Sequence, residues 1–210
     1  MVRDGYYYAL GSVAAALLLG WLTHLWPLAV LPLLLGVFFL WFFRDPERRI
    51  PQGEGEVVSC ADGVVTGIDP LETPEGSFRR ISIFLSVFNV HVNRAPVSGE
   101  VIDVEYRRGK YLNAMNPASA EQNEQCICRL RTEDGQVVVF KMIAGLLARR
   151  IVFRPVAGDK LVRGGRVGLI KFGSRCDVIL PASAEMRVRV GDKVHGGSSV
   201  LATLAKEGRA

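Results

Sequence analysis

The chain has 210 residues, a formal net charge of +5 and a pI of about 9.2. This balance fits an anionic partner, either nucleic acid or acidic lipid, and the apolar N-terminus together with the lack of a base-reading motif favours lipid. Cys126 and Cys128 are too close for a zinc knuckle, and no histidine pair accompanies them. With Cys60 and Cys176 they are expected to be reduced thiols facing the cytosol, with no metal site and no disulfide framework.

Residues 1–43 are predicted to form a membrane hairpin of two short transmembrane helices. No Asp, Glu, Lys or Arg occurs from Gly5 to Phe43, and this stretch suits two short spans, because one span needs about 20 residues. The break is expected at residues 23–27, where proline and aromatic residues occur. Arginines at position 3 and at positions 44, 48 and 49 predict that both ends lie on the cytoplasmic side of the cell membrane. A cleaved signal peptide and a single tilted or re-entrant segment are the alternatives.

A charged juxtamembrane linker is expected at residues 44–55 and a β-rich domain at residues 56–210. Short β-type runs follow one another there, mostly separated by Gly, Asp or Pro, which is typical of an all-β sandwich or barrel. The predicted strands are residues 56–58, 64–68, 80–85, 101–106, 127–132, 137–143, 151–155, 167–172, 177–180 and 187–190. One short helix is expected around residues 118–124, and the lack of long amphipathic helices argues against a Rossmann-type domain.

An internal repeat supports a β fold. The Gly-Asp-Lys-Leu-Val-Arg-Gly-Gly sequence at 158–165 recurs 33 residues later as Gly-Asp-Lys-Val-His-Gly-Gly at 191–197. Such turns resemble those of barrel-sandwich-hybrid domains, and two copies are too few for a solenoid. The expected fold is therefore mostly β, a barrel-sandwich-hybrid-like soluble domain with an N-terminal α-helical membrane hairpin. Each repeat, read alone, is a hairpin turn that needs glycine.

Three residues are candidates for chemistry. Asp62 lies in an Ala-Asp-Gly turn, His91 lies in a mixed polar and apolar run, and Ser174 lies in a Phe-Gly-Ser-Arg sequence at 172–175. Each has an ordinary structural interpretation on its own, as a turn aspartate, a structural histidine or a turn serine. An acid, a histidine and a hydroxyl are also the parts of a triad that activates serine as a nucleophile.

These motifs, in this order, resemble the small bacterial and archaeal phosphatidylserine decarboxylases. The resemblance runs from about Phe43 to Leu201 and includes the juxtamembrane sequence at 42–46, the Gly-Lys-Tyr-Leu-Asn-Ala sequence at 109–114 and Asn-Glu at 123–124. The Gly-Ser-Arg form points to the short subclass, which includes phosphatidylserine and archaetidylserine decarboxylases.

One position departs from the longer relatives in this family. They carry a second histidine three residues before the one that matches His91, and this chain has Phe88 there. His91 would then serve both maturation and turnover, or a water or another donor would take one of the two roles.

The resemblance implies that the chain cuts itself between Gly173 and Ser174. Asp62 would orient His91, His91 would take the proton of Ser174 Oγ, and the resulting alkoxide would attack the carbonyl of Gly173. An N-to-O acyl shift would give an ester, and β-elimination would convert residue 174 to dehydroalanine, which water would hydrolyse to a covalent pyruvoyl group and ammonia. The products would be a β chain of residues 1–173 and an α chain of residues 174–210, which form a heterodimer; a dimer of such pairs is a further expectation.

The resemblance also implies the reaction, which converts phosphatidylserine in the bilayer to phosphatidylethanolamine and CO2. The pyruvoyl group would act as the electron sink for CO2 loss, and His91 would protonate the product. Arg94, Lys110 and Arg175 are candidates for binding the headgroup phosphate and carboxylate, although each also has a reading as a solvated surface cation. Archaetidylserine is the alternative substrate.

A non-catalytic function is the second hypothesis: a membrane-anchored barrel-sandwich-hybrid adaptor or carrier. The repeat turns favour it. A carrier needs a modifiable lysine at a hairpin tip, and Lys141 comes closest, but it ends an apolar strand-like run. An adaptor needs a long coiled coil, and no heptads are present. The decarboxylase is therefore the preferred hypothesis.

Overall fold

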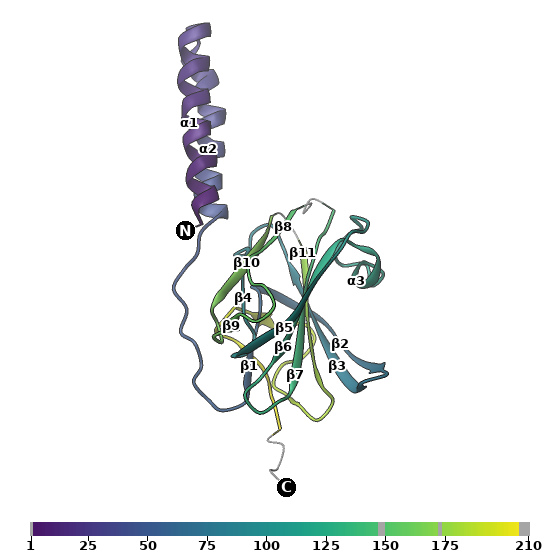
Figure 1. Cartoon of the computed structure of the whole chain (residues 1–210). Helices are drawn as coiled ribbons and strands as arrows, with labels where there is room; N and C mark the ends of the chain where they lie inside the picture. Colours follow the sequence, from purple (N-terminus) through teal and green to yellow (C-terminus); the bar gives the residue numbers. More distant parts are fainter. Residues whose placement is uncertain (1, 147–149, 172–173, 206–210) are drawn as a thin grey trace. The chain divides into compact units, whose positions relative to one another are not determined.

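The computed structural model describes residues 2–146, 150–171 and 174–205, and it divides into two compact units, Met1–Glu47 and Arg48–Ala210. The first unit contains α1 (Arg3–Thr23), the 3-10 helix η1 (Trp26–Ala29) and α2 (Val30–Phe42) (Figure 1). The chain reverses at His24, which has a left-handed φ of 54°, and Pro27 lies in the first turn of η1. The predicted break at residues 23–27 is therefore confirmed.

The two helices run antiparallel and approach each other through small residues. The amide of Val2 donates to the carbonyl of Phe43 across the open end at 3.1 Å. A Cβ added at Gly36 of α2 would lie only 3.3 Å from Cβ of Ser12, as is typical of helices that pack within a bilayer. The buried stripe of α1 consists of Gly5, Ala9, Ser12, Ala16 and Gly20. By length and composition Asp4–Thr23 can cross a membrane, whereas the apolar helical stretch Trp26–Phe42 is shorter.

The second unit is built on an eight-stranded antiparallel sheet. Its order is β13 (Lys193–Val194), β2 (Gly63–Thr73), β3 (Gly76–Leu85), β11 (Ser174–Pro181), β7 (Val137–Ile143), β6 (Gln125–Arg131), β5 (Gly99–Arg107) and β9 (Lys160–Leu161). Two three-stranded sheets complete the unit: β1 (Glu56–Val58), β14 (Val200–Thr203) and β12 (Glu185–Met186); and β4 (Val92–Arg94), β10 (Arg166–Lys171) and β8 (Arg150–Phe153). A short helix, α3 (Ser119–Gln122), precedes β6.

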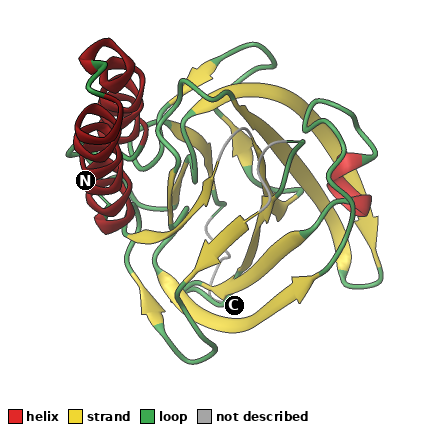
Figure 2. Cartoon of the chain, turned by 90° about the horizontal axis from the view of Figure 1, so that it is seen from above, coloured by secondary structure: helices red, strands yellow, loops and turns green. Residues whose placement is uncertain are grey.

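The eight-stranded sheet curls, and Figure 2 shows the strands of this unit arranged around a common interior. Alternate residues of each strand face that interior, because side chains of a strand alternate between its two faces. On β7, for example, Val138, Phe140 and Met142 are buried, whereas Val139 and Lys141 are only partly covered. The mostly β fold with an N-terminal helical segment is therefore confirmed.

The two sequence repeats form equivalent turns at the two edges of this sheet. Each supplies an edge strand, β9 in the first copy and β13 in the second. In each copy the aspartate carbonyl accepts a hydrogen bond from a long strand, with Val101 donating to Asp159 at 2.8 Å and Val65 donating to Asp192 at 2.9 Å. The repeat is therefore a pseudo-symmetric structural device.

The repeat turns also meet each other. Gly164 and Gly197, which occupy equivalent positions, have φ values of +75° and +78°. A Cβ added at Gly197 would lie 3.5 Å from Cα of Gly164, and both glycines pack against Ile50. This contact brings the two edges of the curled sheet together.

Most of the predicted strands are present, and residues 56–58 and 137–143 are matched to the residue. Phe172, predicted to end a strand, lies outside the described residues. The predicted strand at 187–190 is wrong: the strand is Glu185–Met186, and the amide of Arg189 instead donates to the Asp192 carboxylate within the repeat turn at 2.8 Å. The strands β4, β9, β12, β13 and β14 were not predicted.

Candidate active site

Ser174 is the first residue of β11, where it pairs with Leu85 at the end of β3. It is completely buried, and its Oγ has no hydrogen-bond partner in the part of the chain that the structure describes. A buried hydroxyl without a partner is costly, so such a group calls for a functional explanation. Gly173, the other half of the predicted cleavage bond, lies outside the described residues.

His91 lies just before β4 and is only 2% exposed. Its carbonyl accepts a hydrogen bond from the amide of Ile170 on β10 at 3.3 Å, so the backbone at His91 continues the pairing of β4 with β10. The side chain of Asn93, two residues further on, donates to Sγ of Cys176 on β11 at 3.1 Å.

This contact relates His91 to Ser174. Residues two apart on an extended chain share a face, so His91 lies on the face of Asn93, and Ser174 lies on the face of Cys176. Because Asn93 and Cys176 touch, the side chains of His91 and Ser174 project to the same interior side of their strands. The predicted base and the predicted nucleophile thus each lie two residues from this contact between β4 and β11.

Asp62, the predicted acid, has a different set of contacts. Nη2 of Arg48 lies 2.9 Å from both carboxylate oxygens, and the amide of Gly196 donates to Oδ1 at 2.8 Å. Nδ1 of His195 lies 3.5 Å from Oδ2. A histidine that reaches the Asp62 carboxylate is thus His195, from the second repeat turn.

Sequence reasoning missed both Arg48 and His195 as partners of Asp62. Arg48 was among the arginines that predicted the orientation of the helical segment in the membrane. His195 stands in the second repeat where the first has Val162, and this substitution of a polar side chain for an apolar one is the signal that could have found it.

The three predicted headgroup cations have different surroundings. The guanidinium of Arg175 is buried, with Nε 2.7 Å from Oδ1 of Asp177 and Nη2 2.6 Å from Oγ of Ser82. Arg175 is thus engaged in an ion pair within the sheet. Arg94 is also buried and donates to the carbonyl of Gly164 at 3.0 Å. Lys110 is exposed, and its Nζ contacts Oε1 of Gln122 at 3.1 Å.

The loop between β5 and β6 is fixed to the end of the sheet where Ser174 lies. The side chain of Asn123 donates to the carbonyl of Ala144 at 2.8 Å. The hydroxyls of Tyr106 and Tyr111 both donate to the carboxylate of the largely buried Glu124. Burial, together with the hydrogen bond to Glu124, raises the pKa of Tyr106 to about 12. This loop is therefore an ordered part of the site's surroundings.

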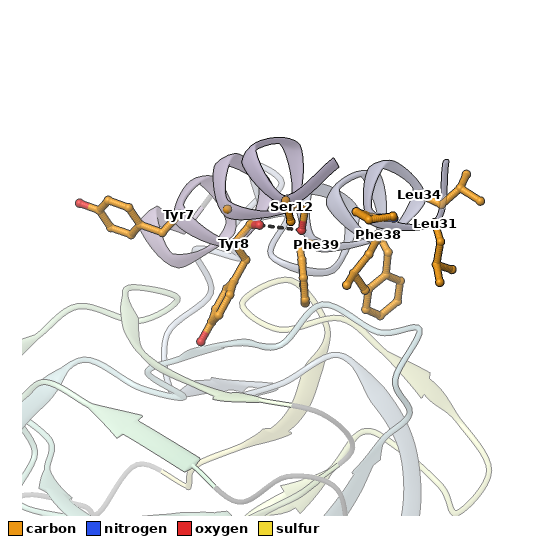
Figure 3. Close-up of a pocket in the computed structure, with 11 residues that line it drawn as sticks. Tyr7, Tyr8, Ser12, Leu31, Leu34, Phe38 and Phe39 are labelled. Atoms are coloured by element: carbon orange, nitrogen blue, oxygen red, sulfur yellow. Dashed lines mark hydrogen bonds between the residues drawn. The ribbon is translucent and has the colours of Figure 1, made fainter. Parts of the chain in front are cut away.

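Two grooves lie elsewhere. One, of about 740 Å³, lies between α1 and α2, and Figure 3 shows Tyr8, Ser12 and Phe39 among the side chains that line it. The other, of about 630 Å³, lies on the outer face of the eight-stranded sheet and includes Lys141. Neither is lined by Ser174 or His91. Among the described residues no cluster of three or more His, Cys, Asp or Glu side chains is placed to hold a metal ion.

Comparison with known proteins identifies the family. The family model described as phosphatidylserine decarboxylase matches residues 35–202, which is most of the chain. A phosphatidylserine decarboxylase proenzyme of Solibacter usitatus is 48% identical over 203 residues, covering 96% of each chain. Proteins with the same name from Symbiobacterium thermophilum and Aromatoleum aromaticum are 46% and 42% identical, each covering 97% of this chain and 95% of the relative. The chain belongs to the phosphatidylserine decarboxylase family.

Proposed function

We propose that this protein is a precursor that cleaves itself between Gly173 and Ser174 and then decarboxylates phosphatidylserine to phosphatidylethanolamine. The observation that carries the proposal is the fully buried Ser174, whose Oγ has no hydrogen-bond partner among the described residues and whose side chain projects to the same side as that of His91. The relatives support it, since they share 42–48% of their residues with this chain and are named proenzymes of this activity.

In maturation, His91 accepts the proton of Ser174 Oγ, and the oxygen attacks the carbonyl carbon of Gly173. The peptide bond then gives way to an ester, and the amine of residue 174 is freed. Burial of both side chains favours this step, because it keeps water from competing for the acyl group. Glycine at 173 leaves the approach of the oxygen free of a Cβ clash.

Asp62 is proposed as the acid that supports His91. Its turn lies against the strand that follows His91, because the carbonyl of Cys60 accepts from the amide of Arg94 at 2.9 Å and from the side chain of Asn93 at 3.3 Å. The ion pair with Arg48 and the bond from the amide of Gly196 fix the orientation of the Asp62 carboxylate. Through this turn Asp62 is proposed to influence the position of His91.

The cofactor proposed is a pyruvoyl group made from Ser174. The site fits such a group, because residue 174 is buried at a strand start and its side-chain oxygen has no competing hydrogen bond among the described residues. A pyruvoyl group supplies an electron sink for the loss of CO2 from an amine-bearing substrate. His91 is proposed to return a proton to the product.

The two chains produced by cleavage are proposed to remain together as a heterodimer. The α chain, residues 174–210, would begin with β11, and β11 lies between β3 and β7 inside the eight-stranded sheet. Its register runs from Ser174 opposite Leu85 to Pro181 opposite Phe78. Separation of the chains would require opening this ladder on both sides, so tight association without a covalent link is expected.

The helical unit is proposed as a membrane anchor with both ends on the cytoplasmic side. The antiparallel pairing of α1 and α2 and the large exposed apolar side chains Trp21, Leu31 and Val37 support this placement. Residues 1–43 then form the hairpin, residues 44–55 the linker and residues 56–210 the catalytic domain. A phospholipid substrate in the same bilayer is held near the enzyme by this arrangement.

The function is tested by following CO2 release from phosphatidylserine labelled at its carboxyl carbon. Wild-type protein in mixed micelles should release CO2, and phenylhydrazine, which reacts with the ketone of a pyruvoyl group, should abolish the release. The Ser174→Ala variant should be inactive and uncut. A wild-type chain that is active but insensitive to phenylhydrazine would contradict the cofactor, and a folded inactive chain would contradict the reaction.

A further inference from the structure

One end of the eight-stranded sheet gathers the loops around Ser174. In the register of the sheet, Ser174 lies opposite Leu85, where β3 ends, and its neighbour Arg175 lies opposite Ile143, where β7 ends. Ile143 in turn lies opposite Gln125, where β6 begins, and Gln125 lies opposite Arg107, where β5 ends. Three loops therefore lie at the same end of the strands: the turn after β3, the loop between β5 and β6, and the start of the loop after β7. This end of the sheet is called the rim.

In the part of the chain that the structure describes, each of these three loops exposes a large apolar side chain. Phe88 in the turn after β3 is 70% exposed, Met115 in the loop between β5 and β6 is 63% exposed, and Leu146 after β7 is 59% exposed. Loops of a soluble domain are usually polar at such tips. Large exposed apolar side chains that gather on one side of a domain are typical of an interaction site, and these three loops lie at the same end of the sheet.

The apolar tips are presented by ordered turns. The side chain of Asn89 accepts from both the amide and the hydroxyl of Ser86, at 2.9 and 2.8 Å, and so closes the turn that carries Phe88. The side chain of Asn113 accepts from the amide of Met115 itself at 3.0 Å. Because side-chain hydrogen bonds fix the backbone of these turns, the fold itself holds Phe88 and Met115 in exposed positions.

The charges on the rim complement an anionic surface. Arg108 and Lys110 are exposed on the loop that carries Met115, and the nearby exposed acid on this loop is Glu121. Arg107 is neutralised by Glu105, with Nε 2.5 Å from Oε1. Apolar tips flanked by basic side chains are the combination that favours the interface of a bilayer containing acidic lipids.

We propose that the rim docks on the phospholipid bilayer, with Phe88, Met115 and Leu146 entering the headgroup region and Lys110 and Arg108 lying at the level of the phosphates. The inference rests on the proposed function, since a lipid headgroup must reach residue 174 while its acyl chains stay in the membrane. It also gives a role to Phe88, which stands where longer relatives have a histidine. The rim is a second membrane contact, distinct from the helical anchor.

The proposal is tested on the full-length chain with an environment-sensitive fluorophore (NBD) on single introduced cysteines. Phe88→Cys, Met115→Cys and Leu146→Cys are labelled, and Val162→Cys is the matched control, because Val162 is 72% exposed and lies next to β9, at the opposite end of β5. Unsubstituted protein corrects for labelling of the four native thiols, all of which are buried. The probes are vesicles of phosphatidylcholine with phosphatidylserine, compared with detergent.

In vesicles the three rim labels should shift their emission to the blue and become protected from aqueous quencher, while the label at 162 should stay water-exposed. Rim labels as accessible as the label at 162 would overturn the proposal. Protection that appears already in detergent and grows with protein concentration would place a second copy of the chain on the rim and would also overturn it.

Kinetics supply a second test. The variant Phe88→Ser/Met115→Ser/Leu146→Ser should mature normally and keep its kcat on micelle-dispersed substrate, but its KM for vesicle substrate should rise about tenfold. An unchanged KM on vesicles would contradict rim docking. Self-cleavage is measured separately by mass spectrometry. A chain that matures but does not dock would contradict only the docking proposal, whereas a wild-type chain that never matures would contradict the proposed function.

Discussion

The side-chain amide of Asn93 donates to Sγ of Cys176 at 3.1 Å and to the carbonyl of Cys60 at 3.3 Å, so one buried residue joins three segments of the site. Asp62 and Ser174 each lie two residues from a group that Asn93 contacts, and His91 lies two residues from Asn93 itself. The relative placement of the three candidate residues thus depends on a side chain that does no chemistry itself.

Removal of this amide should loosen the site. Asn93→Ala leaves the carbonyl of Cys60 with one donor fewer and is expected to lower the free energy of unfolding by about 1–3 kcal/mol. Self-cleavage should slow more than tenfold, since misplacement of reacting groups by about 1 Å can cost on the order of 100-fold. The rate is measured by gel densitometry of newly synthesised chains. Asn116→Ala, in an exposed turn, is the control, and equal rates in both variants would refute this role.

The ion pair between Arg48 and Asp62 should matter for maturation. Arg48→Gln removes the cation that contacts both carboxylate oxygens and is expected to slow self-cleavage by about 100-fold, with Arg48→Lys in between. Arg163→Gln is the matched control, because Arg163 also ties down the linker, through the carbonyls of Pro51 and Gly53, without contacting Asp62. If both glutamine variants slow cleavage equally, Arg48 acts only by holding the linker.

The repeat turns should be sensitive to substitution where they meet. Gly164→Ala faces both a positive φ and Ile50, whose Cδ1 lies 2.4 Å from the new Cβ, whereas Gly135→Ala has a φ of +85° with open space. The positive φ costs each variant about 1–2 kcal/mol. Overpacking against Ile50 burdens only Gly164→Ala, so its loss of stability should exceed that of Gly135→Ala by at least about 1 kcal/mol. Thermal unfolding in detergent provides the comparison. Equal losses would mean that Ile50 moves aside without cost.

The thiols of β6 should resist ionisation. Burial raises the pKa of Cys126 to about 11 and that of Cys128 to about 12. Between the ordinary thiol pKa of about 8.5 and these values the unfolded chain loses protons that the folded chain keeps, so these groups make stability fall as pH rises through that range. At pH 9 iodoacetamide should alkylate them slowly in the folded protein and rapidly in urea. Fast alkylation of the folded chain at Cys126 and Cys128 would contradict their burial.

The sequence predicted the elements whose pattern is local. Residues 137–143 alternate in a way that matches the buried Val138, Phe140 and Met142, and the proline near position 27 marked the turn between the two helices. The glycine-rich repeat likewise indicated equivalent turns, because positive φ values restrict the residue type.

What could not be predicted depends on contacts that are distant in the sequence. The partners of Asp62 are 14, 133 and 134 residues away, so no local pattern indicates them. The strand β4 is only three residues long and carries the buried polar side chains of Asn93 and Arg94. Polar residues in so short a run are typical of a loop. The Arg-Val-Arg-Val alternation at 187–190 resembles a strand, but the Asp192 carboxylate captures the amide of Arg189 and makes a turn there.

The central claim is that Ser174 becomes the first residue of a new chain, and intact mass spectrometry of the wild-type protein in detergent tests it most directly. Two species are expected, residues 1–173 and residues 174–210, the second carrying a pyruvoyl group in place of its N-terminal serine. The Ser174→Ala variant should give one uncut chain under the same conditions. A folded wild-type protein that remains a single chain of 23.1 kDa would contradict the account.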